Sequence, residues 1–113
     1  MENCIFCKIA NKEIPCSIAY EDDVIIAIHD LQPQAPVHVL IIPKEHIASL
    51  DEVSFDHVEA MGWLMAKVTD IAAQLGLENG YRLVCNCGED GMQTVKHLHF
   101  HLLGKRKMLW PPG

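Results

Sequence analysis

Apolar and polar residues alternate most regularly near the end of the chain. In "HLHFHLLG", residues 97–104, a histidine stands at every second position, and leucine or phenylalanine lies between the histidines. Residues two apart on a strand point to the same face of a sheet. The pattern therefore predicts a strand over residues 95–103, with one apolar face and one face that carries His97, His99 and His101.

The rest of the hydrophobic pattern predicts four more strands and two helices. Segments rich in β-branched residues, bounded by turn residues, predict strands at 17–23, 24–30, 37–43 and 81–87. Apolar spacing of three and four residues predicts a short helix within 3–14 and a long one before Gly76, with Ser54 as N-cap. The apolar stripe of the long helix consists of Val58, Met61, Met65, Val68, Ile71, Ala72 and Leu75.

This order of elements favours the α+β class, an antiparallel sheet with the helices grouped against one face. The length of 113 residues, half of them hydrophobic, is that of a single domain, residues 1–113. A formal net charge of −6 would repel a nucleic-acid backbone, although it does not exclude a single nucleotide in a pocket. No run of residues is apolar for long enough to cross a membrane, and the start lacks a secretory signal. We therefore expect a cytoplasmic protein with reduced thiols.

Two groups of residues are candidates for chemistry. A row of imidazoles can act as nucleophile, proton carrier or metal ligand, although a solvent-facing, histidine-rich strand and a pure metal site stay open as interpretations. Cys4 and Cys7 have the spacing of half a zinc site, yet two cysteines on one helical turn are more often part of a core. Cys85 and Cys87 have no further ligands near them in the sequence, which favours a packing role.

Several motifs together resemble one known family. "HLHFHLL" matches the histidine triad (HIT) signature. "CIFCKIANKEIP", "HDLQPQAPVHVLIIPKEHI", "DGMQTVKHLHFHLLG" and the terminal "WPPG" are similar to its nucleotide-binding Hint branch. The matches extend over nearly the whole chain, so the resemblance implies a single HIT domain with the HIT-like fold.

The resemblance also implies a reaction. The family hydrolyses nucleoside phosphates that are substituted at the α-phosphorus, through a covalent nucleotidyl-histidine. The family's nucleophile falls on His99, and His101 would hydrogen-bond the phosphoryl oxygens. His38, on the neighbouring strand, would complete a tetrad with the triad histidines, His97 among them, and orient the nucleophilic ring.

The nucleotide contacts of the family fall on further positions. Asp30 would hold the ribose hydroxyls, since both of its carboxylate oxygens can accept hydrogen bonds. The base pocket would be formed by Leu31, Phe6 and Ile9. The phosphate and leaving group would meet Asn86, Gln93 and Thr94. Met92 departs from the family, which commonly has glycine there.

Some members that carry the CxxC motif bind zinc, and the four equivalent residues here are Cys4, Cys7, His46 and His97. Such a closed Cys2His2 set suits a structural ion. His97 thus has two implied roles, as a member of the catalytic triad and as a zinc ligand. No organic cofactor is expected.

The resulting functional prediction is a purine nucleoside phosphoramidase, a hydrolase that cleaves the P–N bond of adenosine or guanosine 5′-phosphoramidates. Two alternatives are a dinucleoside polyphosphate hydrolase, as in the Fhit branch, and a nucleotide-binding module with little turnover. Members of the Hint branch are generally homodimers that pack the long helix and a sheet edge together, and we expect the same here. The tail takes part in substrate choice in that branch, so Trp110 is either a specificity residue or an anchor for the chain end.

Overall fold

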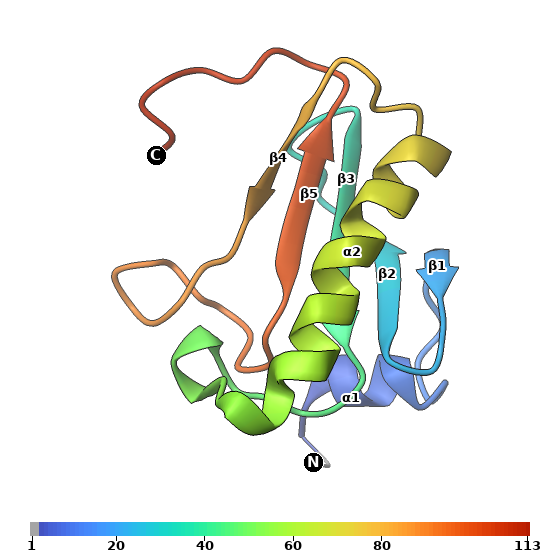
Figure 1. Cartoon of the computed structure of the whole chain (residues 1–113), viewed down its shortest axis with the longest axis vertical. Coiled ribbons are helices and arrows are strands. Elements are labelled where there is room, and N and C mark those ends of the chain that lie inside the picture. The colour runs from blue at the N-terminus through green and yellow to red at the C-terminus, as the bar shows by residue number, and fades with distance from the viewer. Residues whose placement is uncertain (1–2) are drawn as a thin grey trace.

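Five antiparallel strands form a single sheet in this computed structural model, which describes residues 3–113. The sheet order is β1-β2-β3-β5-β4, and the strands are β1 Ile18–Glu21, β2 Ile25–His29, β3 Val37–Pro43, β4 Tyr81–Val84 and β5 Phe100–Gly104. The helices are α1 Ile5–Ala10 and α2 Val58–Gln74, and the 3-10 turns are η1 Leu50–Glu52 and η2 Phe55–His57. An antiparallel sheet with one long and one short helix confirms the predicted α+β class (Figure 1).

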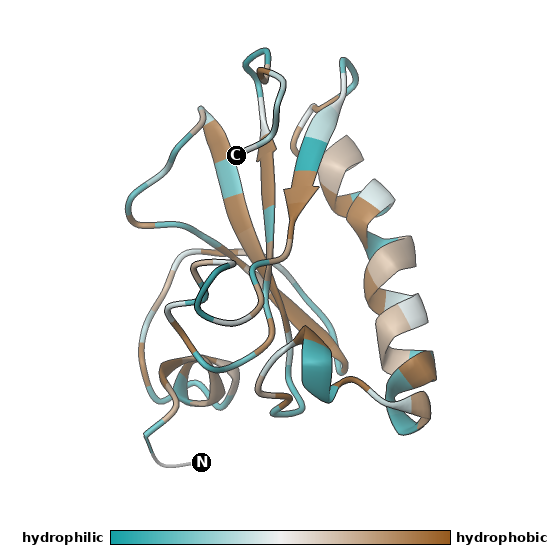
Figure 2. Ribbon diagram, turned by 90° about the vertical axis from the view of Figure 1, so that its left-hand side faces the viewer, coloured by the Kyte–Doolittle hydropathy of each residue, from teal (hydrophilic) through white to brown (hydrophobic). Residues whose placement is uncertain are grey.

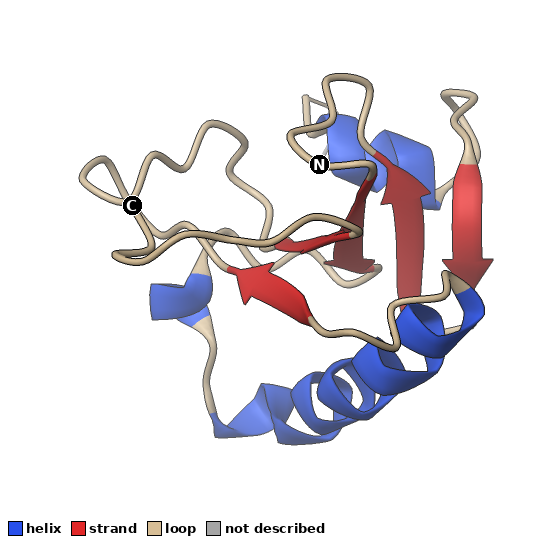
Figure 3. Cartoon of the chain, turned by 90° about the horizontal axis from the view of Figure 1, so that it is seen from above, coloured by secondary structure: helices blue, strands red, loops and turns tan. Residues whose placement is uncertain are grey.

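The two helices lie on opposite faces of the sheet (Figure 3), so the prediction that they share one face is wrong. One apolar cluster joins Leu64 and Val68 of α2 to the odd-numbered residues of β2 and β3. A second joins Phe6 and Ile9 of α1 to the even-numbered residues of the same strands. The sequence carries a sign of this arrangement. "IIAI" and "VLII" are continuous apolar runs, which are typical of strands buried on both faces (Figure 2).

The long helix differs from its prediction at both its start and its buried stripe. Ser54 caps the turn η2 rather than α2, because its hydroxyl accepts the N–H of Asp56 at 3.2 Å. The buried residues of α2 are Leu64, Val68, Ile71 and Ala72. The predicted stripe omitted Leu64 and included Val58 and Met65, which the structure leaves exposed on the outer side of α2.

The strands that carry the candidate chemistry are shorter than predicted. β5 begins at Phe100 rather than at residue 95, because the preceding backbone bonds elsewhere: the N–H of Leu98 donates to the carbonyl of Ile47 at 2.6 Å. β4 ends at Val84, so Cys85 and Cys87 lie beyond it. The alternation of faces still holds, because Leu98 and Phe100 belong to the cluster beneath α2. Within residues 3–113, none of the helices combines the length and apolar composition needed to span a membrane.

Candidate active site and metal centre

The histidines gather on the face of the sheet to which α1 is attached. His38 lies on β3 and His101 on β5, and these two strands are hydrogen-bonded neighbours. His99 directly precedes β5, and its ring packs edge-on against Phe6 of α1, with the ring centroids 5.0 Å apart. The centroids of the His99 and His101 rings lie 5.2 Å apart. Residues far apart in the sequence thus place three imidazoles side by side.

The hydrogen bonds of His99 define which of its nitrogens is free. Its Nδ1 lies 2.7 Å from the carbonyl oxygen of His97. Because a carbonyl can only accept, Nδ1 must carry the proton of the neutral ring. Nε2 therefore keeps its lone pair. The side chain is buried, so a nucleophilic nitrogen is held in one orientation within the site.

His38 and His101 form a directed pair. The N–H of Gln34 donates to Nδ1 of His38 at 3.0 Å, so the neutral His38 ring carries its proton on Nε2. That nitrogen lies 2.9 Å from Nδ1 of His101 and donates to it. The remaining proton of His101 is consequently on its own Nε2. Burial lowers the pKa of both rings, so both are neutral at pH 7.

The pairing corrects one role implied by the resemblance. His38 was expected to orient the nucleophilic ring, but its hydrogen bond goes to His101, whereas the ring of His99 is held by the backbone of His97. His38 can therefore influence His99 only through His101, whose ring lies between them in this network.

Asp30 lies at the end of β2 beside this pair. Its Oδ1 accepts the N–H of Gln32 at 2.8 Å, and its Oδ2 lies 3.5 Å from Nε2 of His38. Asp30, His38 and His101 lie close enough together to be considered as metal ligands. The hydrogen bond from Gln34 argues against a metal there, because it leaves the proton of His38 on the very nitrogen that would have to coordinate the ion.

A second cluster joins the first helix to the histidine segment. Nδ1 of His97 lies 3.2 Å from Sγ of Cys4, 3.5 Å from Sγ of Cys7 and 3.2 Å from Nδ1 of His46. Sγ of Cys7 lies 3.3 Å from Nδ1 of His46. Nitrogen and sulfur ligand atoms around a tetrahedral zinc ion lie roughly 3.3 to 3.8 Å apart. The four atoms thus have the chemistry and nearly the spacing of a closed zinc site.

The protonation states in this cluster also suit a metal. Nε2 of His97 lies 2.8 Å from the carbonyl of Pro43 and donates to it, which leaves the lone pair of Nδ1 directed at the cluster. Burial, with the Cys4 thiol beside it, raises the pKa of Cys7 to about 11. A divalent cation would reverse that effect and hold the thiolate. Cys4, Cys7, His46 and His97 could therefore hold Zn²⁺.

Comparison with known proteins identifies the family. Residues 11–108 match the family model described as the HIT domain. The chain belongs to the HIT domain family. Among its relatives, a HIT-like protein of Synechococcus elongatus is 54% identical over 112 residues, which cover 99% of this chain and 98% of the relative. The "14 kDa zinc-binding protein" of Zea mays is 49% identical over 111 residues, covering 96% of this chain and 87% of the relative.

Solved structures of HIT proteins have the same fold. A HIT family hydrolase from Legionella pneumophila superposes with a TM-score of 0.96 at 50% identity, covering 98% of this chain and 100% of that one. A histidine triad nucleotide-binding protein from Candida albicans gives a TM-score of 0.84 at 35% identity, covering 93% and 76%. These neighbours confirm the predicted HIT-like fold.

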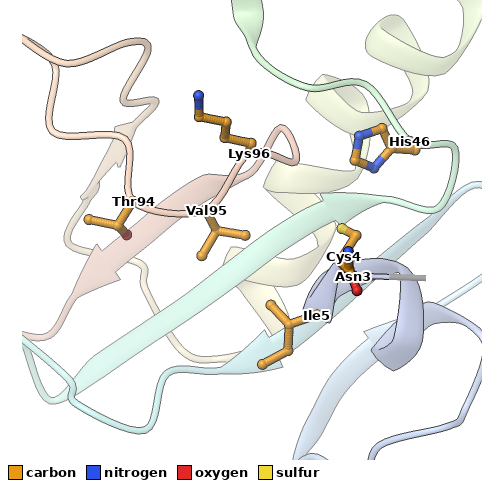
Figure 4. Close-up of a pocket in the computed structure, with 7 residues that line it drawn as sticks. All are labelled: Asn3, Cys4, Ile5, His46, Thr94, Val95 and Lys96. Carbon is orange, nitrogen blue, oxygen red and sulfur yellow. The ribbon is translucent and has the colours of Figure 1, made fainter. Parts of the chain in front are cut away.

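A cavity opens beside the metal cluster of this HIT protein. Its volume is about 520 Å³, and its lining consists of Asn3, Cys4, Ile5, His46, Thr94, Val95 and Lys96 (Figure 4). Cys4 and His46 lie near one another at one end, and Thr94 lies at the other. The cavity gives an ion a path from solvent to two of the four ligands.

The nucleotide-binding residues expected from the HIT resemblance are only partly brought together. Phe6 and Ile9 are buried in the core under α1, whereas Leu31 is 95% exposed. The amide of Gln93 is occupied: its Nε2 donates to two carbonyls, and its Oε1 accepts the N–H of Gly88. Gln93 therefore stabilises its own loop and ties it to the segment at Ala48. Asn86 is half-buried beyond the end of β4.

Two further side chains depart from simple expectations. Met92 has a φ of 61° and is 72% exposed, so most of its side chain is in contact with solvent. Trp110 is 81% exposed and does not anchor the chain end within this one chain.

The sequence did not reveal three backbone groups that fix the orientation of the histidine rings in the site. They are the N–H of Gln34 and the carbonyls of Pro43 and His97, each of which bonds a histidine ring. Backbone groups are present at every position, so residue type carries no sign of them. The only available sign was position, since "QPQAP" precedes the strand that carries His38 and Pro43 ends it.

Proposed function

We propose that this HIT protein is a purine nucleoside phosphoramidase of the Hint branch. Nε2 of His99 attacks the α-phosphorus of an adenosine or guanosine 5′-phosphoramidate, and the P–N bond breaks as the amine leaves with a proton taken up from solvent. Water then attacks the nucleotidyl-histidine and releases a proton to solvent, which forms the nucleoside monophosphate and restores His99. The observation that carries this proposal is the free Nε2 of His99, on a ring that is otherwise buried, next to the donor on His101.

The surrounding groups suit the separate parts of this reaction. Nε2–H of His101 is a donor that can stabilise the negative charge on the phosphoryl oxygens as the new bond forms. Asp30 keeps lone pairs for the ribose hydroxyls, since each of its oxygens can accept more than one hydrogen bond. The proposal is further supported by the names of two neighbours, a hydrolase and a nucleotide-binding protein.

We propose that a structural zinc ion binds Cys4, Cys7, His46 and His97. Support comes from the geometry of the cluster and from the name of the Zea mays relative. A zinc-bound His97 cannot act as a free acid or base. Its role in the reaction is then to hold its own carbonyl, which fixes the ring of His99.

We also propose a homodimer in which α2 and the free edge strand β4 of two chains pack together. Val58 and Met65 are exposed on α2 although both are large and apolar. β4 pairs on one side only, with β5. An edge strand and an exposed apolar helix face together provide a surface that a second copy can cover.

Hydrolysis of adenosine 5′-phosphoramidate by the wild type, His99→Ala and His57→Ala tests the activity. Removing the nucleophile should lower kcat by about a thousandfold or more, and denaturing a reacting wild-type sample should trap nucleotidyl-protein. Binding of AMP, measured by calorimetry, should survive in His99→Ala. His57→Ala, at the start of α2 and outside the site, should keep the wild-type rate.

Each competing function has its own result in this assay. Equal rates for the wild type and His99→Ala would remove His99 as the nucleophile. A wild type that binds AMP but hydrolyses neither the adenosine nor the guanosine compound would be a binding module. Faster cleavage of a diadenosine polyphosphate than of the phosphoramidates would assign the chain to the Fhit type of activity.

A further inference from the structure

The loop between β2 and β3, residues 31–36, carries the group that orients His38. It contains two prolines, which donate no backbone hydrogen bond, and most of its residues are exposed. Inside the loop, Gln32 donates its N–H to Asp30, and the amide of Gln34 donates to the carbonyl of Gln32 at 3.0 Å. These contacts are local and do not attach the loop to the rest of the molecule.

Arg106 attaches this loop to the rest of the molecule. Its Nε donates to the carbonyl of Gln34 at 3.0 Å, across 72 residues of sequence. The chain turns sharply after β5, where Lys105 has a φ of 69°, and this turn brings Arg106 to the loop. Among residues 3–113, no other side-chain hydrogen bond joins loop residues 31–36 to a residue outside the segment 30–38.

The contacts form a continuous relay. Arg106 holds Gln34 at 3.0 Å, the N–H of Gln34 donates to His38 at 3.0 Å, and Nε2 of His38 donates to His101 at 2.9 Å. Both hydrogen bonds of His38 in this series involve a buried ring. A shift of Gln34 would free Nδ1 of His38 to take the proton, and the direction of the hydrogen bond to His101 would then be lost.

We infer that Arg106 is a positioning residue, which holds the β2–β3 loop so that His38 and His101 keep a single protonation pattern. The expected loss of kcat rests on the proposed function, whereas the expected change in the protonation pattern of His38 and His101 does not. Arg106 touches neither ring, and its charge is not needed for the effect. What matters is a donor at the position of its Nε, directed at the carbonyl of Gln34.

The test compares Arg106→Met, Arg106→Gln and Lys107→Met in the full chain with zinc present. Lys107 is exposed, so its substitution removes the same charge one residue away without touching the loop. Arg106→Met removes the donor and should lower kcat for adenosine 5′-phosphoramidate by about tenfold with little change in KM, because a misplaced reacting group costs up to about a hundredfold. Arg106→Gln, whose amide nitrogen can take the place of Nε as donor, should restore part of the loss, and Lys107→Met should match the wild type.

Nitrogen-15 NMR of the histidine rings provides a readout that a general loss of stability would not move. In the wild type, His38 should show a protonated Nε2 and an unprotonated Nδ1. In Arg106→Met, its two nitrogens should move toward the averaged signals of exchanging tautomers, while the signals of His99 should stay.

An unchanged His38 spectrum in Arg106→Met would overturn the inference, whatever happens to the rate. Equal losses in Arg106→Met and Lys107→Met would also overturn it, because the effect would then come from charge alone. A wild type without phosphoramidase activity would refute the proposed function, and the NMR comparison would still decide the role of Arg106.

Discussion

At the scale of single residues, backbone groups make chemically equal histidines unequal. The carbonyl of Pro43 accepts a hydrogen bond from Nε2–H of His97, and the carbonyl of His97 accepts one from Nδ1–H of His99. His97 therefore presents Nδ1 to the metal cluster, and His99 presents Nε2 to the site. Nδ1 of His101 accepts a hydrogen bond from His38, so its own proton is on Nε2, which can donate. One hydrogen bond per ring is enough to assign these roles.

Met92 gives a test of local backbone strain. Its φ of 61° is in the left-handed region, where a side chain costs about 1 kcal/mol and glycine costs little. Met92→Gly should therefore raise the free energy of unfolding by up to about 1 kcal/mol, measured by urea denaturation. Met108→Gly, outside the positive-φ positions, is the control and should be destabilising. A loss of stability in Met92→Gly would show that the methionine side chain contributes contacts that outweigh the strain.

Cys7 tests the metal centre. Cys7→Ser replaces a thiolate by a weak ligand, so zinc content should fall from about one equivalent to below a tenth. The free energy of unfolding should fall by about 2 kcal/mol or more, because the ion ties α1 to the histidine segment. Metal analysis of protein purified without added metal or chelator, and thermal denaturation, measure the two effects.

Cys16→Ser is the matched control for this experiment, since Cys16 is exposed and lies outside the cluster. It should leave both zinc content and stability unchanged. Wild-type protein with less than a tenth of an equivalent of zinc would refute the metal centre, as would full zinc retention in Cys7→Ser.

At the scale of elements, one carboxylate ties α2 to the β1–β2 turn. Asp22 accepts hydrogen bonds from the N–H groups of Val24 and Ile25, from the Tyr20 hydroxyl, and from the ring N–H of Trp63 on α2 at 2.8 Å. Burial acts to raise the pKa of Asp22, but these four bonds together outweigh it and lower the pKa from 3.8 to about 2. The charged form is therefore the one that the fold stabilises.

Asp22→Asn should lower the free energy of unfolding at pH 7 by about 1 kcal/mol, a figure reduced for the solvent around the carboxylate. Because the folded-state pKa is depressed, the contribution of Asp22 is complete above about pH 4 and is lost as the pH falls toward 2. Urea denaturation at several pH values should show the free energies of unfolding of the wild type and Asp22→Asn converging as the pH falls over this range. Asp23→Asn, at the exposed neighbouring position, should have the free energy of unfolding of the wild type at every pH. A difference between the wild type and Asp22→Asn that does not change with pH would contradict the assignment.

The elements also show where sequence reasoning succeeds. Alternation along residues 97–102 correctly predicted which side chains face the core, because that alternation is a local property of extended backbone. It did not predict where β5 begins, since the bond from Leu98 to Ile47 depends on a segment 51 residues away. Spacing within α2 likewise could not distinguish Leu64 from Met65, because the sheet beneath α2 decides which side is buried.

The same division applies to the candidate site. The residue types of the zinc cluster and the histidine face were recognisable from motifs, and the structure brings Cys4, Cys7, His46 and His97 together. Leu31 was placed in an apolar pocket by resemblance alone, yet it is almost fully exposed in the single chain. The relay through Gln34 and Arg106 could not be anticipated, because it depends on how the chain turns after β5.

At the scale of the whole molecule, the outer face of α2 is unusual for a helix that serves one chain. Val58, Gly62 and Met65 lie three and four residues apart, so they share a face, and all three are exposed. A glycine inside a helix costs about 1 kcal/mol relative to alanine. A Cβ added at Gly62 would meet no heavy atom of the described chain within 4 Å, so packing inside one chain does not explain the glycine.

The proposed homodimer explains it, because a glycine lets two helices approach closely where they cross. Gly62→Ala should stabilise the isolated chain by about 0.5 to 1 kcal/mol while weakening the dimer by about tenfold in Kd or more. Light scattering over a dilution series measures the Kd of the dimer, and urea denaturation of dilute protein measures the stability of the isolated chain.

Met65→Glu should give a mass near one chain, whereas Ile18→Glu, on the edge strand β1 at the other side of the sheet, should leave the dimer intact. A wild type with the mass of one chain at every concentration would refute the dimer, and a Gly62→Ala dimer as strong as the wild type would place the helix crossing elsewhere.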